Sequence, residues 1–440
     1  MIERNKVTLS LLVFCVAAGM KYDINFGVRI PVGELLAFAS LPFLLQSIRW
    51  KHYQASLFTA IAVLAVWAFA VCLSDFVNSI PLNLFMKGLA KPIWCGFWMF
   101  FFIGVLVRDY RALYAYPIGL VIAGLQNYFF PQAWTAYYAN AGEYEATAFA
   151  IVPLILPILL SFALYFYRRI PFISVLVYLI GAILFAYLGV PRGTTAVSLL
   201  VSLVMAYMWN FRLRQIQVKK IPMGRVTLIL ILFFCASYVI FEIYVWIASN
   251  GWMGEMQQQK LKAQSDTIFG NSIFGVILDG RTSVFAAILA IMDQPLVGFG
   301  SWQAKTLSEY YLRALSMIGT DGSEYQRMIS YGSPGAGHSI FFAAWAENGI
   351  FAALSLAICG FWIFKEWLNV IFKDNPFAPL LVFMGIFFFW SYLFSPFGVE
   401  SRLVIGLFLA LRITQFCKNP PDVNSGSSRI IRTYSNKITV

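Results

Sequence analysis

The sequence predicts an all-α, polytopic integral membrane protein with about 12 transmembrane helices and one large, mainly helical loop outside the cytoplasm. Three observations lead to this fold class. Hydrophobic residues make up 60% of the 440 positions, only 12% are charged, and the mean hydropathy is +0.73. A soluble domain of this length would not stay dispersed with such a composition. Long apolar segments recur along the chain, and basic residues concentrate in alternate connections between them.

Apolar segments near 20 residues are long enough to cross a hydrocarbon layer about 30 Å thick. The candidate spans are 7–21, 30–48, 56–74, 90–107, 113–130, 147–167, 171–188, 194–211, 226–248, 338–364, 377–394 and 402–417. We therefore divide the chain into nine spans in residues 1–248, a large loop at 249–337, three spans at 338–417, and a basic tail at 418–440 that we expect to be disordered.

The distribution of lysine and arginine predicts the orientation of these spans. With the N-terminus inside, 20 of the 32 basic residues fall in cytoplasmic segments, but only 5 of the 20 acidic residues do. Both termini should then be cytoplasmic, and the large loop should face the other side. The net charge of +12 is thus explained by topology. Nucleic-acid binding would need one continuous basic face, which the sequence does not contain.

His338 is the first candidate catalytic residue. It is one of two histidines, and it begins the tenth predicted span after the flexible segment Ser333–Gly337. The positive end of a helix dipole disfavours the imidazolium, so a histidine at this place stays neutral and can accept a proton near pH 7. His52 lies in a cytoplasmic basic cluster and is expected to be an ordinary surface residue.

Arg192 and Arg281 are the candidate ligands for an anionic substrate. Arg192 lies in a Pro-Arg-Gly-Thr turn between two apolar segments, and Arg281 opens a short apolar helix that ends before Pro295. A cation held at the non-cytoplasmic edge opposes the usual charge bias of membrane proteins, so it needs a reason. A fixed guanidinium offers planar, bidentate donors that suit a phosphate.

Other charged residues on this side receive smaller roles. A second loop helix is predicted over Trp302–Met317. Secondary substrate contacts are expected from Arg313, Arg327, Arg402, Lys87 and Lys91. Glu347 is nine residues after His338, which puts it on the opposite face of an α-helix and about two turns deeper. We therefore expect Glu347 to be structural, together with Asn348, rather than to orient the histidine.

The spacing of Arg281, Pro295-Leu296-Val297-Gly298-Phe299-Gly300, His338-Ser339 and Glu347-Asn348-Gly349 resembles the O-antigen ligase (WaaL-type) and O-antigen polymerase (Wzy) superfamily. Pro191-Arg192-Gly193-Thr194 is similar to the Ser-Arg-Gly-Ala segment of that family. The resemblance is specific for roughly residues 189–361 and only topological elsewhere. Ser339 stands where the family usually has asparagine, and Pro191 where it has serine.

The resemblance implies an integral inner-membrane glycosyltransferase with its active site in the periplasm. Such an enzyme moves a glycan from undecaprenyl diphosphate to a sugar of lipid A–core, with no metal and no cofactor. Arg192 and Arg281 would hold the diphosphate, and His338 would deprotonate the acceptor hydroxyl. The expected partners are the lipid-linked donor, the lipid A–core acceptor and membrane lipids, with no nucleic acid.

Three alternatives stay open at this point. An O-antigen polymerase or a protein O-oligosaccharyltransferase would use the same chemistry with a different acceptor. A twelve-helix transporter or flippase is less favoured, because most charges lie near span ends and the two halves show no repeat. Glu34, Glu242 and Glu347 are the nearest exceptions to this charge distribution.

Overall fold

The computed structural model describes residues 2–25, 29–46, 48–130, 144–187, 192–213, 282–302, 304–318, 339–373 and 375–416, with isolated positions between 224 and 252. Its α-helices are α1 (Ile2–Ala18), α2 (Val32–Leu45), α3 (Gln54–Val77), α4 (Leu82–Asp109), α5 (Ala115–Phe129), α7 (Tyr144–Tyr167), α8 (Pro171–Tyr187), α9 (Arg192–Leu213), α13 (Thr282–Asp293), α14 (Ala304–Ile318), α16 (Ile340–Phe372), α17 (Ala378–Phe394) and α18 (Val399–Thr414). Short 3-10 helices are η1 (Gly19–Lys21), η2 (Trp50–His52) and η3 (Tyr110–Tyr114).

The all-α prediction is confirmed for the described residues, with one small addition. Strands β1 (Asp23–Asn25) and β2 (Arg29–Pro31) form an antiparallel hairpin between α1 and α2, with Ile24 opposite Ile30. This hairpin falls at the boundary between the first two predicted spans. The short loop helices are also as expected, since α13 and α14 match the two that the sequence places in the large loop.

Three helical stretches within the described residues are long and apolar enough to cross a membrane. They are α3, the run from α4 through η3 to α5 (Leu82–Phe129), and α16. The other apolar helices of the described ranges are shorter, so the count of twelve spans stays a prediction. Helix starts and ends also differ from the predicted spans: α4 begins at Leu82, and α16 continues to Phe372.

The earlier start of α4 and the longer α16 place several charged residues inside helices. Lys87, which precedes the predicted span 90–107, lies inside α4, and so does Lys91, which that span already contained. Glu366 follows the predicted span 338–364, and it is fully buried within α16. Its Oε2 accepts a hydrogen bond from Asn369 Nδ2 at 3.1 Å. Glu366 lies within the last two turns of α16, which continues to Phe372.

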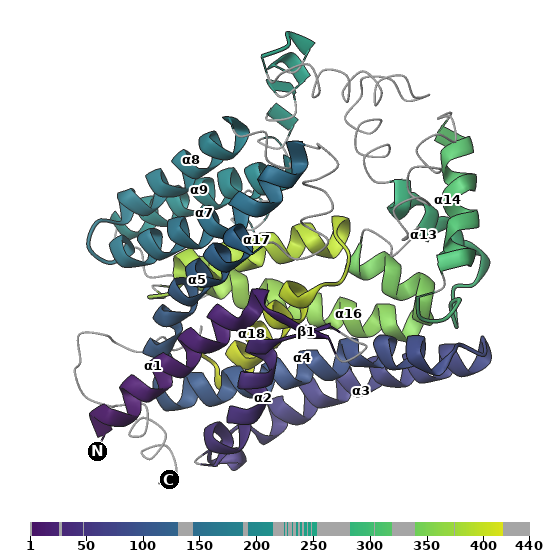
Figure 1. Cartoon of the computed structure of the whole chain (residues 1–440), viewed down its shortest axis with the longest axis horizontal. Helices are drawn as coiled ribbons and strands as arrows, with labels where there is room; N and C mark the ends of the chain where they lie inside the picture. Colours follow the sequence, from purple (N-terminus) through teal and green to yellow (C-terminus); the bar gives the residue numbers. More distant parts are fainter. Residues whose placement is uncertain are drawn as a thin grey trace.

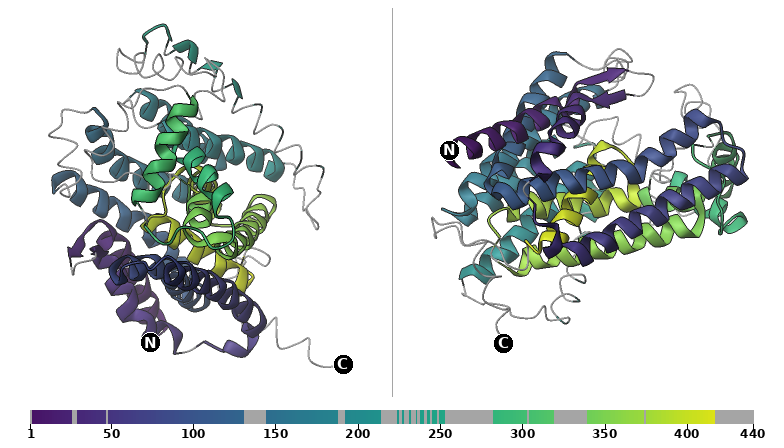
Figure 2. Two further views of the ribbon diagram at one scale, coloured as in Figure 1. Left: turned by 90° about the vertical axis from the view of Figure 1, so that its right-hand side faces the viewer. Right: turned by 90° about the horizontal axis from the view of Figure 1, so that it is seen from below.

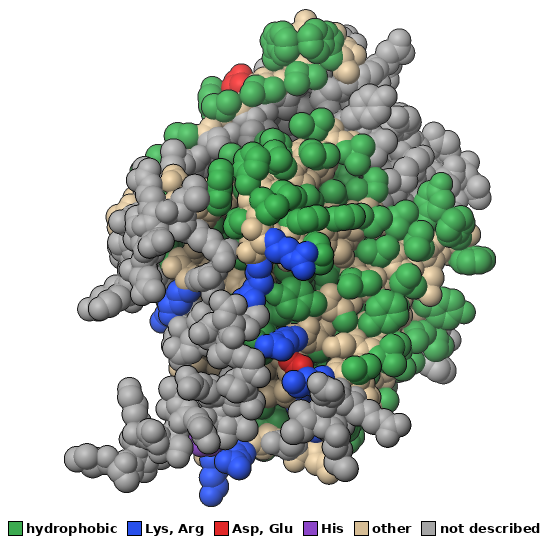
Figure 3. All heavy atoms as spheres, turned by 90° about the vertical axis from the view of Figure 1, so that its left-hand side faces the viewer, with side chains coloured by type: hydrophobic (Ala, Val, Ile, Leu, Met, Phe, Trp, Pro, Cys, Tyr) green, Lys and Arg blue, Asp and Glu red, His purple; other side chains and the backbone are tan. Residues whose placement is uncertain are grey.

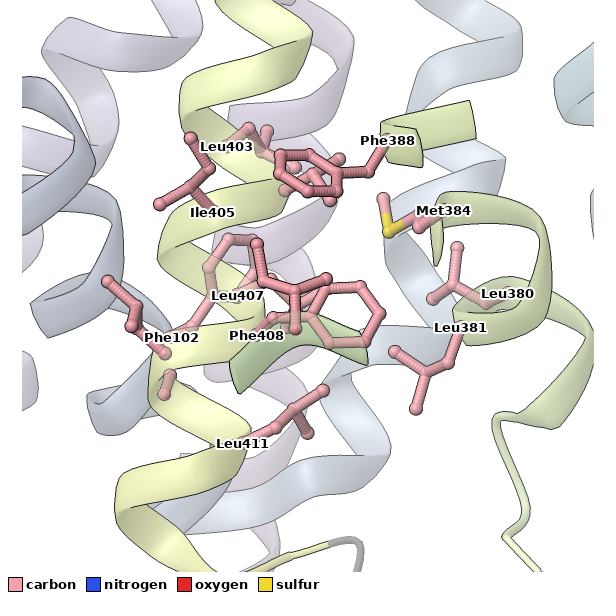
Figure 4. Close-up of a cluster of buried hydrophobic side chains, with 14 of the residues drawn as sticks. Phe102, Leu380, Leu381, Met384, Phe388, Leu403, Ile405, Leu407, Phe408 and Leu411 are labelled. Atoms are coloured by element: carbon pink, nitrogen blue, oxygen red, sulfur yellow. The ribbon is translucent and has the colours of Figure 1, made fainter. Parts of the chain in front are cut away.

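The long helices form a layered bundle. α3, α4 and α16 run side by side, and α7, α8 and α9 form a second group against α5 and α17 (Figures 1 and 2). α18 packs along α4, and its Leu403, Leu407 and Phe408 belong to the same buried apolar core as Phe388 of α17 (Figure 4). This core holds α16 and α4 in a fixed relation, which matters because both carry buried charges.

The two ends of the bundle differ in character. α13 and α14 lie at the end where α3 turns into α4, at the right of Figure 1. Basic side chains gather on the opposite end, which faces the viewer in Figure 3. The last turns of α4, η3 and α18 carry Arg108, Arg111 and Arg412, respectively. The bundle thus has one end covered by short helices and another rich in positive charge.

Candidate functional site

The site begins with a break in α16. Gly349 has φ 73° and ψ −169°, which interrupts the helix one third of the way along. A broken helix leaves backbone groups without intrahelical partners, and such groups are costly in an apolar environment. Here the turn that follows α13 supplies the partners. Phe299 N–H donates to Ala346 O at 2.9 Å, Gly300 N–H donates to Glu347 O at 2.7 Å, and Ile350 N–H donates to Leu296 O at 3.1 Å.

Two glycines make this close approach of backbones possible. A Cβ at Gly349 would lie 2.1 Å from Leu296 O, and a Cβ at Gly298 would lie 2.6 Å from Glu347 O. Both residues also have positive φ, a conformation that side chains other than glycine rarely adopt. We call the paired segments 296–300 and 346–350 the interlock. It explains in structural terms why Gly-Phe-Gly and Glu-Asn-Gly occur together in this sequence.

The turn from α3 to α4 holds the interlock from the other side. Ser74 Oγ donates to Glu347 O at 2.7 Å, and Asn78 Nδ2 donates to Gly298 O at 3.0 Å. Asp75 Oδ1 accepts from Ser301 N–H at 2.6 Å. Three segments that are far apart in the sequence therefore meet through backbone and side-chain hydrogen bonds, most of them buried.

A buried ion pair lies directly beside the interlock. Lys91 Nζ is 2.5 Å from Glu347 Oε2, and the two side chains are only 10% and 3% exposed. The Lys91 ammonium also lies 5.1 Å from the centroid of the Trp302 ring. Trp302 has φ 60°, an uncommon value for a residue with a bulky side chain. Strained residues of this kind concentrate at functional sites.

The ion pair forms one wall of a small pocket of about 40 Å³. Its other walls include Trp67, Trp302, Ile340 and Phe397. Ile340 is the first residue of α16, and Ser339 caps that helix: its Oγ accepts from Phe342 N–H and donates to Tyr392 O. The pocket thus lies along the first turns of α16.

Two polar atoms near the interlock make no hydrogen bond to any described residue, although they are buried. They are Asp75 Oδ2 and Asn348 Oδ1. Asn348 uses its Nδ2 to donate to Ser301 Oγ at 3.3 Å. Among the described residues, Lys91 forms an ion pair with Glu347 and not with Asp75. Buried carboxylate oxygens without partners are expensive, and they mark a place where a proton or a ligand donor is expected.

A second ion pair lies further along the same face of α4. Arg402 Nη2 donates to Glu34 Oε2 at 2.8 Å, and Trp98 Nε1 donates to Glu34 Oε1 at 3.3 Å. The Arg402 guanidinium lies 5.3 Å from the ring centroid of Trp94. Lys91, Trp94 and Trp98 are spaced three and four residues apart, so they share one stripe of the helix. This stripe joins α4 to α2, α16 and α18.

The sequence-predicted site residues are only partly visible in this arrangement. His338, Arg281 and Arg327 lie outside the described residues, and Arg192 is described only as the first backbone position of α9. Lys87 is exposed on α4. Arg313 is exposed on α14, with Nη1 3.7 Å from Asp293 Oδ2. Of the expected secondary contacts, Lys91 and Arg402 are instead engaged by Glu347 and Glu34.

Helices α13 and α14 are held together by a hydrogen bond outside the bundle core. Tyr310 Oη donates to Asp293 Oδ2 at 2.7 Å. Partial burial, together with this hydrogen bond and the Asp293 charge, raises the pKa of Tyr310 to about 12. The phenol is therefore protonated at neutral pH and acts as a donor.

Sequence reasoning missed Asp75, Ser301 and Trp302 as parts of the site, and it missed Lys91 as the partner of Glu347. One signal was present for Lys91, because a lysine within an apolar helix needs a buried acidic partner. No comparable pattern marked Asp75, which follows an ordinary apolar segment. Within the described ranges, no group of three or more His, Cys, Asp or Glu side chains is gathered so that it could hold a metal ion.

Comparisons with known proteins do not assign the chain to a family. No protein-family model matches it, and a search of curated proteins finds no significant relative. The described part of the chain defines a helical protein with three stretches long and apolar enough to cross a membrane, and with a buried, charged cluster at the end covered by α13 and α14.

Proposed function

We propose that this protein is an O-antigen ligase, a metal-independent inverting glycosyltransferase of the bacterial inner membrane. It would move O-antigen polysaccharide from undecaprenyl diphosphate to a sugar hydroxyl of lipid A–core during lipopolysaccharide biosynthesis. The positive end of the bundle would be cytoplasmic, and the end covered by α13 and α14 would face the periplasm. The proposal rests on the sequence resemblance, and one structural observation supports it most.

That observation is the direct packing of α13 on α16. Ala287, Ala290 and Ile291 of α13 form one apolar cluster with Ala346 of α16. Arg281 immediately precedes the first residue of α13, and His338 immediately precedes the cap of α16. Arg281 and His338 are about sixty residues apart in the sequence, but each of them directly precedes a helix or its cap. These two helices, α13 and α16, pack against each other. This arrangement supports the assignment of Arg281 and His338 to one site.

In the proposed mechanism, the arginines and the histidine have separate tasks. Arg192 and Arg281 bind the diphosphate of the donor and offset the negative charge that develops on the leaving group. His338 takes the proton of the acceptor hydroxyl while the hydroxyl oxygen attacks the anomeric carbon. The bond from that carbon to the diphosphate breaks in the same step, so the anomeric configuration inverts. The interlock keeps the head of α16 fixed during this reaction.

Complementation of a strain that lacks this gene product tests the proposal. Wild-type protein should restore polymer-capped lipopolysaccharide, and His338→Ala or Arg281→Ala should lower transfer about 10²–10⁴-fold at equal membrane abundance. His52→Ala is the matched control, since His52 is exposed at η2 and should retain wild-type transfer. Undiminished transfer by either site variant would refute the mechanism. Single-repeat caps in the deletion strain would indicate a polymerase, and a change confined to glycoproteins would indicate a protein O-oligosaccharyltransferase.

Transport is the second candidate function. One structural observation favours it, although the sequence disfavoured it. Charged residues are buried within the bundle as pairs, namely Lys91 with Glu347 and Arg402 with Glu34. Glu366 is buried as well. Ionisable residues inside membrane helices often line ion or substrate pathways. Substrate-dependent uptake or charge movement by the purified protein in liposomes, unchanged by His338→Ala, would support transport and contradict the ligase.

A further inference from the structure

The pocket beside the Lys91–Glu347 pair combines features that the proposed mechanism does not use. We propose that it is a saccharide subsite, which receives one hydroxyl or hydroxymethyl group of a sugar ring that stacks on Trp302. The inference rests on the proposed function and deepens it, because it names a pyranose as the group that the enzyme orients beside the head of α16.

The polar groups of the pocket match the hydrogen-bonding capacity of a hydroxyl. A hydroxyl has one O–H donor and two acceptor lone pairs. Glu347 offers a carboxylate acceptor, since only Oε2 is engaged by Lys91. Lys91 keeps ammonium hydrogens beyond the one directed at Glu347. Trp67 supplies a second donor: it lines the pocket, is fully buried, and its Nε1 makes no hydrogen bond to any described residue.

The unpartnered Trp67 nitrogen is the strongest of these observations. Buried indole N–H groups normally find an acceptor, and leaving one without costs about 1–3 kcal/mol. Its ring is fixed by an edge-on contact with Phe397, at 5.6 Å between centroids. The indole that carries this donor is therefore held in place as one wall of a pocket whose other polar groups are an ammonium and a carboxylate. An acceptor oxygen from outside the chain would satisfy it.

Trp302 provides a surface for the remainder of a sugar ring. It is 37% exposed, and its left-handed backbone conformation is strained for a bulky residue. Lys91 covers part of the indole at 5.1 Å, and the exposed part remains accessible. The C–H face of a pyranose is apolar and packs on aromatic rings, while its hydroxyls point to the rim. Ligand sites commonly join such apolar walls to a few convergent polar groups.

The size of the pocket limits what it can hold. A volume of about 40 Å³ exceeds the roughly 10–15 Å³ that one water molecule needs, but it cannot enclose a whole sugar ring. Only one substituent of the ring enters, and the ring itself stays at the mouth against Trp302. A site built to pair a hydroxyl should discriminate strongly against an analogue that lacks it, because the buried groups are then left unpaired.

Saturation-transfer NMR on the detergent-purified full-length protein tests this inference with methyl glucoside and its singly deoxygenated analogues as probes. The wild-type protein should bind the parent glycoside and bind one deoxy analogue about tenfold more weakly than the others. Trp302→Ala should abolish binding. Trp67→Phe should remove the preference among the analogues, since the indole donor is lost. Trp252→Ala is the matched control, because Trp252 is an exposed tryptophan outside the pocket and should leave binding unchanged.

The charged pair is tested by Lys91→Met/Glu347→Gln, a double substitution that removes both charges without leaving one unpaired. This variant should fold and should lose the preference among the analogues.

Equal binding by wild type, Trp302→Ala and Trp67→Phe, or no binding by wild type, would overturn the subsite. If wild type transfers glycan but binding does not depend on the pocket, the subsite alone fails. If pocket-dependent binding occurs without any transferase activity, the proposed function alone fails.

Discussion

Lys91 and Glu347 form a buried ion pair across 256 residues of sequence, with 2.5 Å between Nζ and Oε2. Lys91 lies near the start of α4, and Glu347 lies two residues before the break in α16. The same glutamate accepts from Gly300 N–H and Ser74 Oγ through its backbone carbonyl. One residue thus connects α3, α4, α16 and the turn after α13, which makes it the centre of the interlock.

The first prediction concerns the stability of this pair. Lys91→Met should destabilise the protein by about 3–5 kcal/mol, because Glu347 would keep a buried charge without a partner. Lys91→Met/Glu347→Gln should recover most of that loss, since both charges are gone and the volumes are similar. Thermal unfolding of the detergent-purified variants measures both. A double variant as unstable as the single one would contradict the interpretation.

The second prediction concerns the helix break. Gly349→Ala should cost about 3 kcal/mol, because the new Cβ would overlap Leu296 O and because φ is positive. Gly96→Ala in α4 is the matched control. Its Cβ would lie 3.5 Å from Leu64 Cδ1, an ordinary contact, so stability should stay equal or rise slightly. Equal melting temperatures for the two variants would show that the interlock contributes little.

The third prediction concerns Asp75, whose Oδ1 accepts from Ser301 N–H while Oδ2 is buried without a described partner. Asp75→Ala should loosen the turn at Gly300–Trp302, because Ser301 N–H loses its acceptor. Asp75→Asn keeps that acceptor and removes a buried charge, so it should be at least as stable as wild type. Hydrogen exchange at the peptide containing Ser301 distinguishes them: exchange should accelerate in the alanine variant alone.

The fourth prediction separates structural from substrate-binding roles for Arg402. Its guanidinium is directed to Glu34, which is fully buried. Arg402→Met/Glu34→Gln should therefore remain folded, whereas Arg402→Met should be destabilised by about 3–5 kcal/mol. If the double variant keeps wild-type transfer in complementation, Arg402 has no substrate role. A double variant that folds but does not transfer glycan would support the predicted contact between Arg402 and substrate.

Helix positions were predictable from this sequence, because apolar stretches bounded by Gly, Pro and charges have few alternatives. The short α13 is an example, with Asp279-Gly280 before it and Pro295 after it. Contacts between distant segments were not predictable. Nothing in the apolar segment before Asp75 indicates that its carboxylate accepts a hydrogen bond from Ser301 N–H. The partner of Glu347 depends on the relative position of α4 and α16 along their axes. Such pairings are set by packing of whole helices, which no local pattern encodes.

The break at Gly349 was likewise hidden. Apolar segments lie on both sides of Glu347-Asn348-Gly349, and a glycine within such a pattern is tolerated in many helices. The helix is interrupted there because the backbone of Leu296–Gly300 forms hydrogen bonds with the backbone of residues 346–350. The motif therefore has a structural explanation that is separate from catalysis, and the two can be tested independently.

The fifth prediction concerns orientation in the membrane. In a variant whose six cysteines are replaced, Met292→Cys should react with a membrane-impermeant maleimide added to spheroplasts. Met292 is 73% exposed on α13, and α13 lies at the end of the bundle away from the basic face (Figures 1 and 3). His52→Cys should react only after the membrane is permeabilised, because η2 precedes the start of α3 at the opposite end of the bundle. The reverse pattern would place α13 in the cytoplasm, where no lipid-linked glycan donor of the periplasmic leaflet could reach Arg281 and His338. That result would contradict both the orientation predicted from the basic residues and the ligase proposal.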